Sequence, residues 1–497
     1  MESIDLFNSI SPIDFRYYGR NEQIKEKLQP YLSEEAFIKY LAKAESALTN
    51  TLAERGVCSK EIAEEIENVS KQITATEVYL EEDRVKHPIS SLVNCIRNRV
   101  SSQAKPYVHF TATSNDIICP ADAARYRDFT NNVLMPKLLE FEKTLITLSR
   151  REKNTVQIGR THGQHAEPIT FGFAIAQYVS RLGSRIIKIR ETANDLRGKI
   201  AGAVGAYNAS SMFFDDPSQF EAEVLSRLHL EPSPISTQII EAEFMTDYVH
   251  SIISSFSVLA NLADDMRHLQ RSEIGEVQEE FVAKQVGSST MPQKRNPINF
   301  EYVKSMWKTI MPRMVTIYSD QLSEHQRDLT NLESSRFIAE ILAVFYVCLS
   351  LLSEVMAKLT VDRLNMKKNL DMSKDMAAAE PAQVLLSAYG HPNAHEYITK
   401  LTLKSERTRK PFTELLFEDK ELKNYLVKFN EKQLNVLKNP EDGFLGIAIQ
   451  KVEDVCHHWE RKLKVEDKST KIYNKFKGST YRMVPPISTD MNSNKPR

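Results

Sequence analysis

The sequence contains one loop whose residue types and spacing suit anion binding, GSSTMPQKRNP over 287–297. It places two adjacent hydroxyls, Ser288 and Ser289, shortly before the cation of Lys294 and the amide of Asn296. Hydroxyls, backbone N–H groups and an ammonium group on one loop can surround a bound anion. The same composition also suits a polar surface loop with a proline turn, so the spacing alone leaves both interpretations open.

A second polar segment, GRTHGQHAEP over 159–168, carries His162 and His165 beside Glu167. Two histidines three residues apart could bind zinc only with further ligands, and no HExxH motif or cysteine lies nearby. Histidine titrates near neutral pH and a carboxylate can hold its tautomer, which favours a general acid. A histidine that caps backbone groups at a helix entry is the alternative.

A third segment, YVHFTATSND over 107–116, offers hydrogen-bond donors from His109, Thr113 and Ser114. Such donors in an irregular loop suit a carboxylate ligand. An ordinary Ser/Thr turn would have the same composition.

The composition limits the classes of protein to which the chain can belong. Its 497 residues exceed one compact core, and Lys plus Arg (65) nearly cancel Asp plus Glu (66). A net charge of -1 argues against a nucleic-acid coat protein. The five cysteines form no CxxC pair and the N-terminus lacks the features of a secretory signal, so we expect a cytoplasmic protein. The most apolar stretch, Ile341 to Leu352, is too short to span a membrane and predicts a core helix.

The elements that must position these segments are mainly helices. Shorter helices are expected from Ser33 and from Lys60, and a loop over 105–120. Five long helical patterns follow, at 121–150, 168–197, 238–274, 298–326 and 333–360. Pro312 should bend the fourth, and strands should be minor. The broad apolar stripes favour a bundle that oligomerises.

These patterns divide the chain into four parts. We expect an N-terminal helical domain over 1–116, a central bundle over 117–361 and a C-terminal helical domain over 362–465. The remaining 466–497 is basic, rich in Ser, Asn and Pro, and expected to be flexible.

The three polar segments, in this order, resemble the three signature regions of the aspartase/fumarase superfamily. The loop over 287–297 is similar to the superfamily's GSSxMPxKxNP. GRTHGQHAEPITFG, SPIDFRY over 11–17, STQ over 236–238 and QRDLT over 326–330 are most similar to the branch that cleaves adenylosuccinate. The resemblance covers roughly residues 10–465. It implies an all-α, three-domain fold with a long central bundle, and a homotetramer whose active sites each combine segments from three subunits.

The resemblance also implies a reaction. β-Elimination would release fumarate from adenylosuccinate, giving AMP, and from the succinyl-aminoimidazole-carboxamide ribotide of purine biosynthesis. Ser288 would be the base, His162 the general acid, and Glu301 the carboxylate that orients a histidine. Glu301 could instead be a first-turn residue that complements a helix dipole. No metal or organic cofactor is implied, because the substrate's own carboxylate is the electron sink.

Substrate-binding roles follow from the same resemblance. Lys294, Asn296, Thr113 and Ser114 would hold the succinyl carboxylates. The nucleotide phosphate would meet Arg16 and Tyr17, with Arg327 and Arg336 as further cations, although either of these last arginines could equally form a surface ion pair. The remaining residues expected to line the site are His87, His109, Gln238 and Ser289.

Four departures from the superfamily patterns bear on the substrate. Phe15 and Thr111 stand where glycine is usual, Pro88 follows His87 where aspartate is frequent, and Leu332 replaces a substrate-binding serine. A sibling lyase or a carboxymuconate cycloisomerase therefore remains an alternative, as does a catalytically silent scaffold. Nucleic-acid binding through the basic tail has little support, since the tail has few aromatics. The expected partners are a small-molecule substrate and other copies of the chain, neither nucleic acid nor a membrane.

Overall fold

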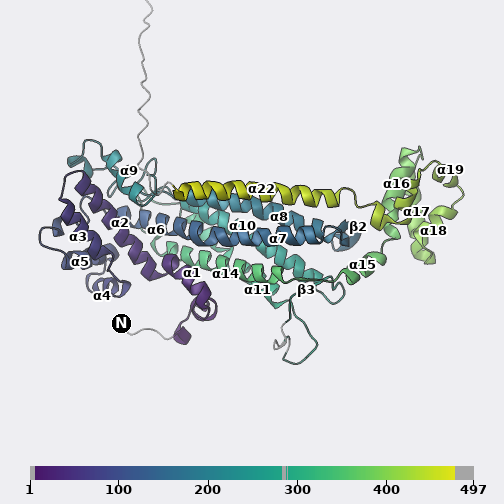
Figure 1. Ribbon diagram of the computed structural model, residues 1–497, viewed down its shortest axis with the longest axis horizontal. Helices are drawn as coiled ribbons and strands as arrows, with labels where there is room; N and C mark the ends of the chain where they lie inside the picture. The colour runs from purple at the N-terminus through teal and green to yellow at the C-terminus, as the bar shows by residue number, and fades with distance from the viewer. Residues whose placement is uncertain (1–5, 282–286, 288, 476–497) are drawn as a thin grey trace, which may run out of the picture.

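The computed structural model describes residues 6–281, 287 and 289–475, and shows an elongated, mostly helical protein (Figure 1). The N-terminal helices gather at one end of the long axis: α1 Glu22–Leu32, α2 Glu34–Glu54, α3 Lys60–Ser70, α4 Ala75–Val85 and α5 Pro88–Arg99. Ser33 caps α2 as predicted, because its Oγ accepts a hydrogen bond from the Ala36 N–H at 3.1 Å. The short segment Ile13–Tyr18 is also helical and precedes α1.

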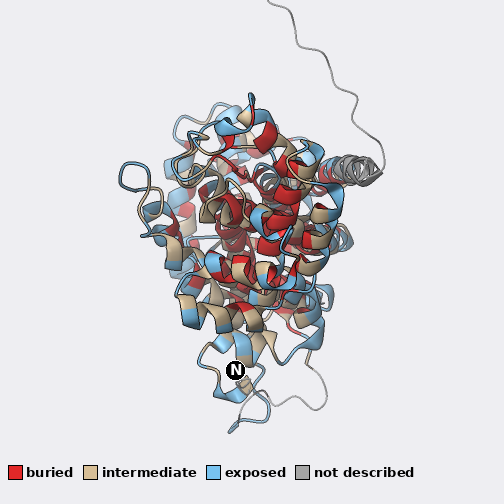
Figure 2. Ribbon diagram, turned by 90° about the vertical axis from the view of Figure 1, so that its left-hand side faces the viewer, coloured by how far each residue is buried: buried red, intermediate tan, exposed pale blue. Residues whose placement is uncertain are grey.

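A bundle of long helices occupies the middle of the molecule. Its members are α6 Ser114–Phe129, α7 Met135–Arg151, α8 Phe171–Asn194, α10 Glu243–Leu269, α11 Ile298–Ile310, α12 Arg313–Ser319 and α14 Ile338–Ala357. The 27 residues of α10 give it a length of about 40 Å. Figure 2 looks along the bundle and shows the buried residues gathered toward its interior. Smaller helices, α9 Pro217–Arg227 and α13 Leu332–Ser335, lie in its connections.

Several helix boundaries differ from the sequence prediction. The segment expected as a loop over 105–120 is irregular only to Thr113, and α6 begins at Ser114 with Pro120 inside it. A capping box between Thr113 and Asp116, with burial of Ile117, outweighs the lost backbone hydrogen bond. The helix expected over 298–326 is interrupted between α11 and α12, next to Pro312 where a bend was predicted, and ends at Ser319.

The apolar helix α14 is the core helix that the sequence predicted. By length and composition, Leu332–Ala357 could cross a membrane, but 67% of its most apolar window is buried inside the protein. Ile341, Leu342 and Phe345 each have 1% exposure or less. Packing against its neighbours therefore accounts for this hydrophobicity.

The C-terminal helices form a smaller unit with its own core. Helix α15 Arg363–Asp371 packs against β1 and leads into this unit, whose helices are α16 Ala379–Ala388, α17 Ala394–Thr408, α18 Phe412–Glu418, α19 Lys423–Leu426, α20 Glu431–Lys438 and α21 Pro440–Gly443. The last helix, α22 Ala448–Lys475, runs back along α7 and α8 (Figure 1). A Cβ on Gly183 of α8 would lie 2.4 Å from the Trp459 ring, so this close approach requires glycine. The part of α22 up to residue 465, which was expected in the C-terminal domain, therefore packs on the central bundle.

Strands are minor, as expected. β1 Val156–Thr161 and β2 Gln164–Thr170 form an antiparallel hairpin, and β3 Val277–Gln278 pairs with β4 Thr360–Val361. The helix expected over 168–197 begins only at Phe171, where the Thr170 side chain caps it. The sequence analysis missed the hairpin, which contains His162.

One buried acid in the bundle predicts a pH-dependent stability. Glu142 on α7 is fully buried, and neither of its carboxylate oxygens has a hydrogen-bond partner among the described residues. Burial raises the pKa of Glu142 well above its ordinary value of 4.5. The folded chain therefore holds this proton more tightly than the unfolded chain, and stability falls as pH rises from about 4.5 through the folded-state pKa.

Replacing Glu142 with leucine should remove that loss. We expect the E142L variant to be more stable than the wild type by roughly 1–3 kcal/mol at pH 8, because no unpaired polar group is buried. The gain should shrink at pH 4. Thermal unfolding at both pH values measures it, and a gain that did not change with pH would rule out an ionisation effect.

Candidate active site

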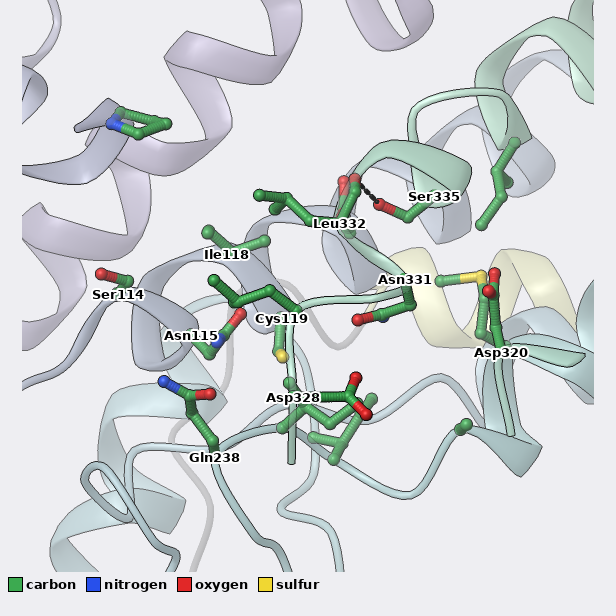
Figure 3. A pocket seen from close by; sticks show the side chains of 18 of the residues that line it. Ser114, Asn115, Ile118, Cys119, Gln238, Asp320, Asp328, Asn331, Leu332 and Ser335 are labelled. Atoms are coloured by element: carbon green, nitrogen blue, oxygen red, sulfur yellow. Dashed lines mark hydrogen bonds between the residues drawn. The ribbon is translucent and has the colours of Figure 1, made fainter. Parts of the chain in front are cut away.

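A cavity of about 440 Å³ lies where several separate segments of the chain meet (Figure 3). The start of α5 brings His87, the start of α6 brings Ser114, and a loop before α10 brings Gln238. Figure 3 places Ser114, Asn115 and Gln238 on one side of the cavity, and Asn331, Leu332 and Ser335 on another. The structure therefore brings three of the predicted substrate-binding residues together.

The N-terminus of α6 presents its donors to this cavity because Asp116 holds it in place. The Asp116 carboxylate accepts hydrogen bonds from the Thr113 N–H at 2.9 Å and from the Ala201 N–H at 3.1 Å. It also pairs with the ammonium of Lys199 at 2.5 Å, and both side chains have 0% exposure. The helix terminus that carries Ser114 is thus fixed by a buried ion pair, and such termini favour anions.

His87 caps the neighbouring helix. Its Nδ1 accepts a hydrogen bond from the Ser90 N–H at 3.2 Å, which leaves Nε2 as the protonated nitrogen of the neutral ring. Pro88 occupies the first position of α5, where proline suits helix geometry. Both Pro88 and Leu332 line the cavity, so two of the four departures face the same space.

His109 lies in the loop before α6 and is paired with Glu45 of α2. The ring Nδ1 lies 2.6 Å from Glu45 Oε1, and the His109 backbone N–H donates to Oε2 at 3.1 Å. Burial lowers the pKa of His109, but the charge and hydrogen bond of Glu45 together outweigh it, so the pKa lies above its ordinary value of 6.5. Sequence inspection did not single out Glu45.

Thr111 stands in this loop where the superfamily has glycine, and its backbone shows why glycine is usual. Its φ is 64°, in the left-handed region that a β-branched residue rarely occupies. Its hydroxyl is buried without a hydrogen-bond partner among the described residues. The substitution thus places strain beside the candidate site.

A second cavity, of about 820 Å³, contains the predicted lysine loop. Lys294, Asn296 and Glu301 all line it, together with Arg267 and Arg271. The carboxylates of Glu273 and Asp362 also line this cavity, so cations and acids face each other across it. Ser288 lies outside the described residues, and Ser289 is exposed.

Hydrogen bonds from two side chains, Asn296 and Glu279, hold the end of this loop and the start of α11. The Asn296 amide donates to the Gly287 carbonyl at 2.8 Å, which closes the loop. The carboxylate of Glu279 accepts from the backbone N–H groups of Asn299 at 3.1 Å and Phe300 at 2.9 Å, and so caps α11. Glu301 is exposed in the first turn of that helix. Sequence inspection missed Glu279 because it precedes the helix by many residues.

His162 lies at the tip of the β1–β2 hairpin. His162 and Gly163 form the two-residue turn, with φ of 55° and 75°, as a type I′ hairpin requires. The His162 ring is exposed. This strained turn therefore places the His162 ring at the surface, and the ring is not buried beside other titratable groups.

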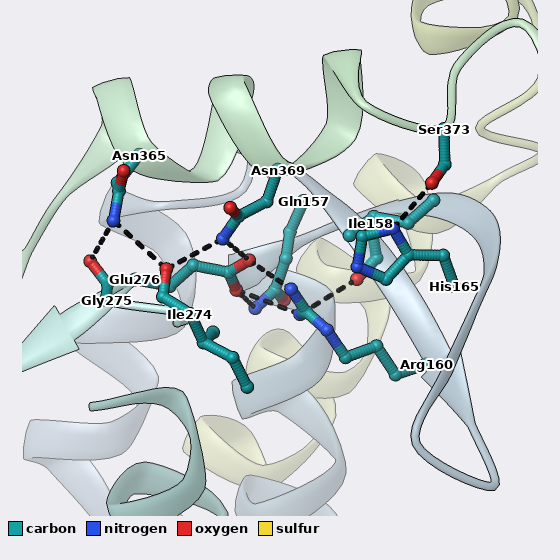
Figure 4. Close-up of polar contacts among 10 residues, drawn as sticks. All are labelled: Gln157, Ile158, Arg160, His165, Ile274, Gly275, Glu276, Asn365, Asn369 and Ser373. Atoms are coloured by element: carbon teal, nitrogen blue, oxygen red, sulfur yellow. Dashed lines mark hydrogen bonds and ion pairs between the residues drawn. The ribbon is translucent and has the colours of Figure 1, made fainter. Parts of the chain in front are cut away.

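The base of this hairpin is fixed by a buried carboxylate (Figure 4). Glu276 has 0% exposure and pairs with Arg160 at 2.6 Å. It also accepts hydrogen bonds from the amides of Gln157 at 2.6 Å and Asn369 at 2.8 Å. The network ties the hairpin to α15 and to the strand β3, so the position of His162 is well defined.

The other titratable groups of the hairpin face the C-terminal unit. His165 Nδ1 lies 2.7 Å from the hydroxyl of Ser373, and burial, together with the charge of Arg160, lowers its pKa. A hydrogen bond with Glu380 raises the pKa of Glu167 to about 7. Over the described residues, no group of three or more His, Cys, Asp or Glu side chains is placed to hold a metal.

The residues predicted to bind the nucleotide phosphate do not gather at one cavity. Arg16 is exposed, and the Tyr17 ring packs against Tyr302 with centroids 5.1 Å apart, next to Glu301. Arg327 donates to the Asp320 carbonyl at 3.0 Å, and Arg336 pairs with Glu333 at 3.0 Å. Neither Arg327 nor Arg336 lines the first cavity.

A single copy of the chain thus places the candidate residues in three regions. The first cavity lies near the start of α6, the lysine loop follows β3, and His162 lies in the turn between β1 and β2, at separate points along the bundle (Figure 1). The Tyr17 ring contacts α11 through Tyr302.

Solved structures of other proteins share this elongated helical fold. The 3-carboxy-cis,cis-muconate lactonizing enzyme from Pseudomonas putida has a TM-score of 0.77 at 20% identity, covering 89% of this chain and 97% of that one. A fumarate lyase from Mesorhizobium sp. BNC1 gives 0.76 at 21% identity, covering 88% and 98%. These likenesses show the fold alone.

Sequence comparison gives the family. Residues 5–311 match the lyase family, and residues 323–436 match the adenylosuccinate lyase C-terminal family. Adenylosuccinate lyase from Archaeoglobus fulgidus is 32% identical over 450 residues, 90% of this chain and 98% of that protein. N-acetyl-S-(2-succino)cysteine lyase from Enterococcus italicus is 28% identical over 448 residues, 89% and 96% respectively. The chain belongs to the lyase family of the aspartase/fumarase superfamily and carries an adenylosuccinate lyase C-terminal domain.

Proposed function

We propose that this lyase-family enzyme cleaves adenylosuccinate to AMP and fumarate, and the succinyl-aminoimidazole-carboxamide ribotide to its carboxamide and fumarate. The observation that carries the proposal is the adenylosuccinate lyase C-terminal match over 323–436, within a chain that is 32% identical to adenylosuccinate lyase from Archaeoglobus fulgidus. The enzyme would act in purine biosynthesis.

The reaction needs a base, an acid and anion-binding groups. In our proposal Ser288 removes the Cβ proton beside a carboxylate, and His162 protonates the departing nitrogen from the opposite face. A serine hydroxyl is a weak base, so Lys294 and backbone N–H groups of its loop must stabilise its deprotonated form. Thr113 and Ser114, on the α6 terminus fixed by Asp116, suit the succinyl carboxylates. No metal or organic cofactor enters these steps.

We propose further that the active site is completed by self-association into a homotetramer. The three regions lie apart in one chain, which supports sites shared between subunits. Exposed apolar side chains on α12 and on either side of it supply a surface for association: Met311, Val315, Tyr318 and Leu322. Val315 and Tyr318, three residues apart, lie on one face of α12, and Met311 and Leu322 flank that helix. The five cysteines are free, which agrees with the proposed cytoplasmic location.

A substrate panel tests the proposed function. The purified protein is incubated with adenylosuccinate, the carboxamide ribotide precursor, argininosuccinate and 3-carboxymuconate, and turnover is followed by ultraviolet absorbance. We expect turnover of the first two. Turnover of another substrate alone would replace the proposal, and a folded oligomer inactive on every substrate would favour a silent scaffold.

A second candidate is a sibling lyase that acts on a different succinylated compound. Two observations favour it: Pro88 and Leu332 both line the first cavity, and the relative from Enterococcus italicus is named as an N-acetyl-S-(2-succino)cysteine lyase. Adding that succinylated cysteine to the panel separates the two candidates.

A further inference from the structure

Glu45 contacts His109 through both of its carboxylate oxygens. It lies in the middle of α2 with 0% exposure, and its carboxylate meets the His109 ring at 2.6 Å and the His109 backbone N–H at 3.1 Å. Within the described part of the chain, the His109 ring is the one basic group at ion-pair distance from this carboxylate. His109 thus contacts both carboxylate oxygens of Glu45, one through its ring and the other through its backbone N–H.

The burial of this carboxylate decides the charge of the ring. An ionised carboxylate that is removed from water is costly unless an opposite charge faces it. The charged groups that act on His109 are Glu45 from α2, Asp116 from α6 and Arg97 from α5. The two acids favour the imidazolium form and the arginine opposes it. The net effect is a raised pKa for His109, in agreement with the ion-pair geometry.

The same contacts decide which ring nitrogen is available. With Nδ1 donating to Glu45, the remaining donor is Nε2–H, which has no hydrogen-bond partner among the described residues. The ring retains 18% exposure. The backbone contact to Glu45 also holds His109 at a φ of 62°, a conformation that is rare for residues other than glycine. His109 is four residues before Thr113, the cap of α6, and Ser114 of that helix lines the first cavity.

We propose that Glu45 is a positioning residue that holds His109 as an imidazolium, with Nε2–H directed as a donor to a carboxylate of the anionic substrate. This inference rests on the proposed function, because it assigns His109 to the substrate site. It concerns only the part of that site that His109 would line.

The test replaces Glu45 with glutamine, which keeps the shape and the backbone hydrogen bond but removes the charge. In wild-type enzyme, kcat/KM should fall as pH rises through the raised pKa of His109, because the cation is lost. In E45Q that falling limb should move to lower pH by about one to three units. In an H109N background, the E45Q change should produce no further shift.

A matched control comes from the same helix. Glu35 of α2 also accepts a backbone N–H, that of Ala75 at 2.8 Å, but contacts no histidine. E35Q should therefore leave the pH profile unchanged. A folded E45Q enzyme with an unshifted limb, or a limb that shifts equally in E35Q, would overturn the proposal.

A measurement on the wild-type chain covers the case in which E45Q does not fold. In protein labelled with 13C-histidine, the signal that is absent from H109N belongs to His109. This signal should titrate with a midpoint above pH 6.5, and the ring form whose Nδ1 bonds to Glu45 should dominate. A pKa at or below 6.5 would overturn the assignment. This readout is independent of turnover, so an enzyme inactive on adenylosuccinate would remove the proposed function without deciding the role of Glu45.

Discussion

Replacing Ser288 with alanine is expected to lower kcat by roughly 10²–10⁴-fold and to leave KM largely unchanged. As the proposed base, the hydroxyl acts only while the Cβ proton is removed. Its loss therefore destabilises the transition state and leaves the stability of the bound substrate unchanged. Substrate affinity should persist, because in the proposed site other groups would hold the carboxylates, among them Lys294 and Ser114, each of which lines a cavity. Initial-rate kinetics on adenylosuccinate, with binding to the inactive variant measured by calorimetry, separates the two effects.

The neighbouring serine provides the control for this variant. Ser289 is assigned to substrate binding, so S289A should raise KM more than it lowers kcat. If S288A retained near-normal turnover, the base would have to be another residue. If S288A lost binding along with turnover, the hydroxyl would be a substrate contact.

The second large effect is expected on stability, from replacing Lys199 with methionine. The Lys199 ammonium pairs with Asp116 at 2.5 Å and donates to the Gly202 carbonyl at 2.8 Å, with neither side chain exposed. Without it, Asp116 is a buried carboxylate that no cation neutralises, which typically costs about 3–5 kcal/mol. Because Asp116 also caps α6, the terminus that carries Ser114 should loosen, and KM should rise. Denaturant unfolding and initial-rate kinetics measure both effects.

The double variant K199M/D116N distinguishes charge burial from lost packing. Removing both charges should recover much of the stability lost in K199M, because asparagine can still accept from the Ala201 N–H. If the double variant were as unstable as the sum of the single variants, packing of the lysine stem would be the cause. A K199M enzyme within 1 kcal/mol of the wild type, about the net value of one ordinary hydrogen bond, would contradict the proposed role of the pair.

Local signals in the sequence predicted much of the fold. Ser33 before a run of helical spacing gave the start of α2, and Pro312 gave the break between α11 and α12. The apolar run of α14 was identified correctly as core. The hairpin that carries His162 was missed because GRTHGQHAEP lacks strand alternation and its turn is His-Gly, not the more usual Asn-Gly. The start of α6 was not predicted, because Pro120 favoured a loop although Thr113 and Asp116 form a capping box.

The candidate site was predictable only where residues form a contiguous motif. The motifs identified Ser114 and Lys294, and the structure places each at a cavity. The groups that hold those motifs come from distant positions: Glu45 is 64 residues from His109, and Lys199 is 83 from Asp116. Such contacts depend on helix packing, which no local pattern records. The assembly between copies stays a prediction for the same reason.

The most direct test of sites shared between subunits mixes two inactive variants. S288A and H162A chains are each expected to be inactive alone, since each lacks the proposed base or acid. After co-expression or mixed refolding, random tetramers should recover activity at about a quarter of the sites, because those combine an intact Ser288 from one copy with an intact His162 from another. Recovery measured as fumarate release from adenylosuccinate would support a site that spans copies. No recovery in a properly formed mixed tetramer would contradict it.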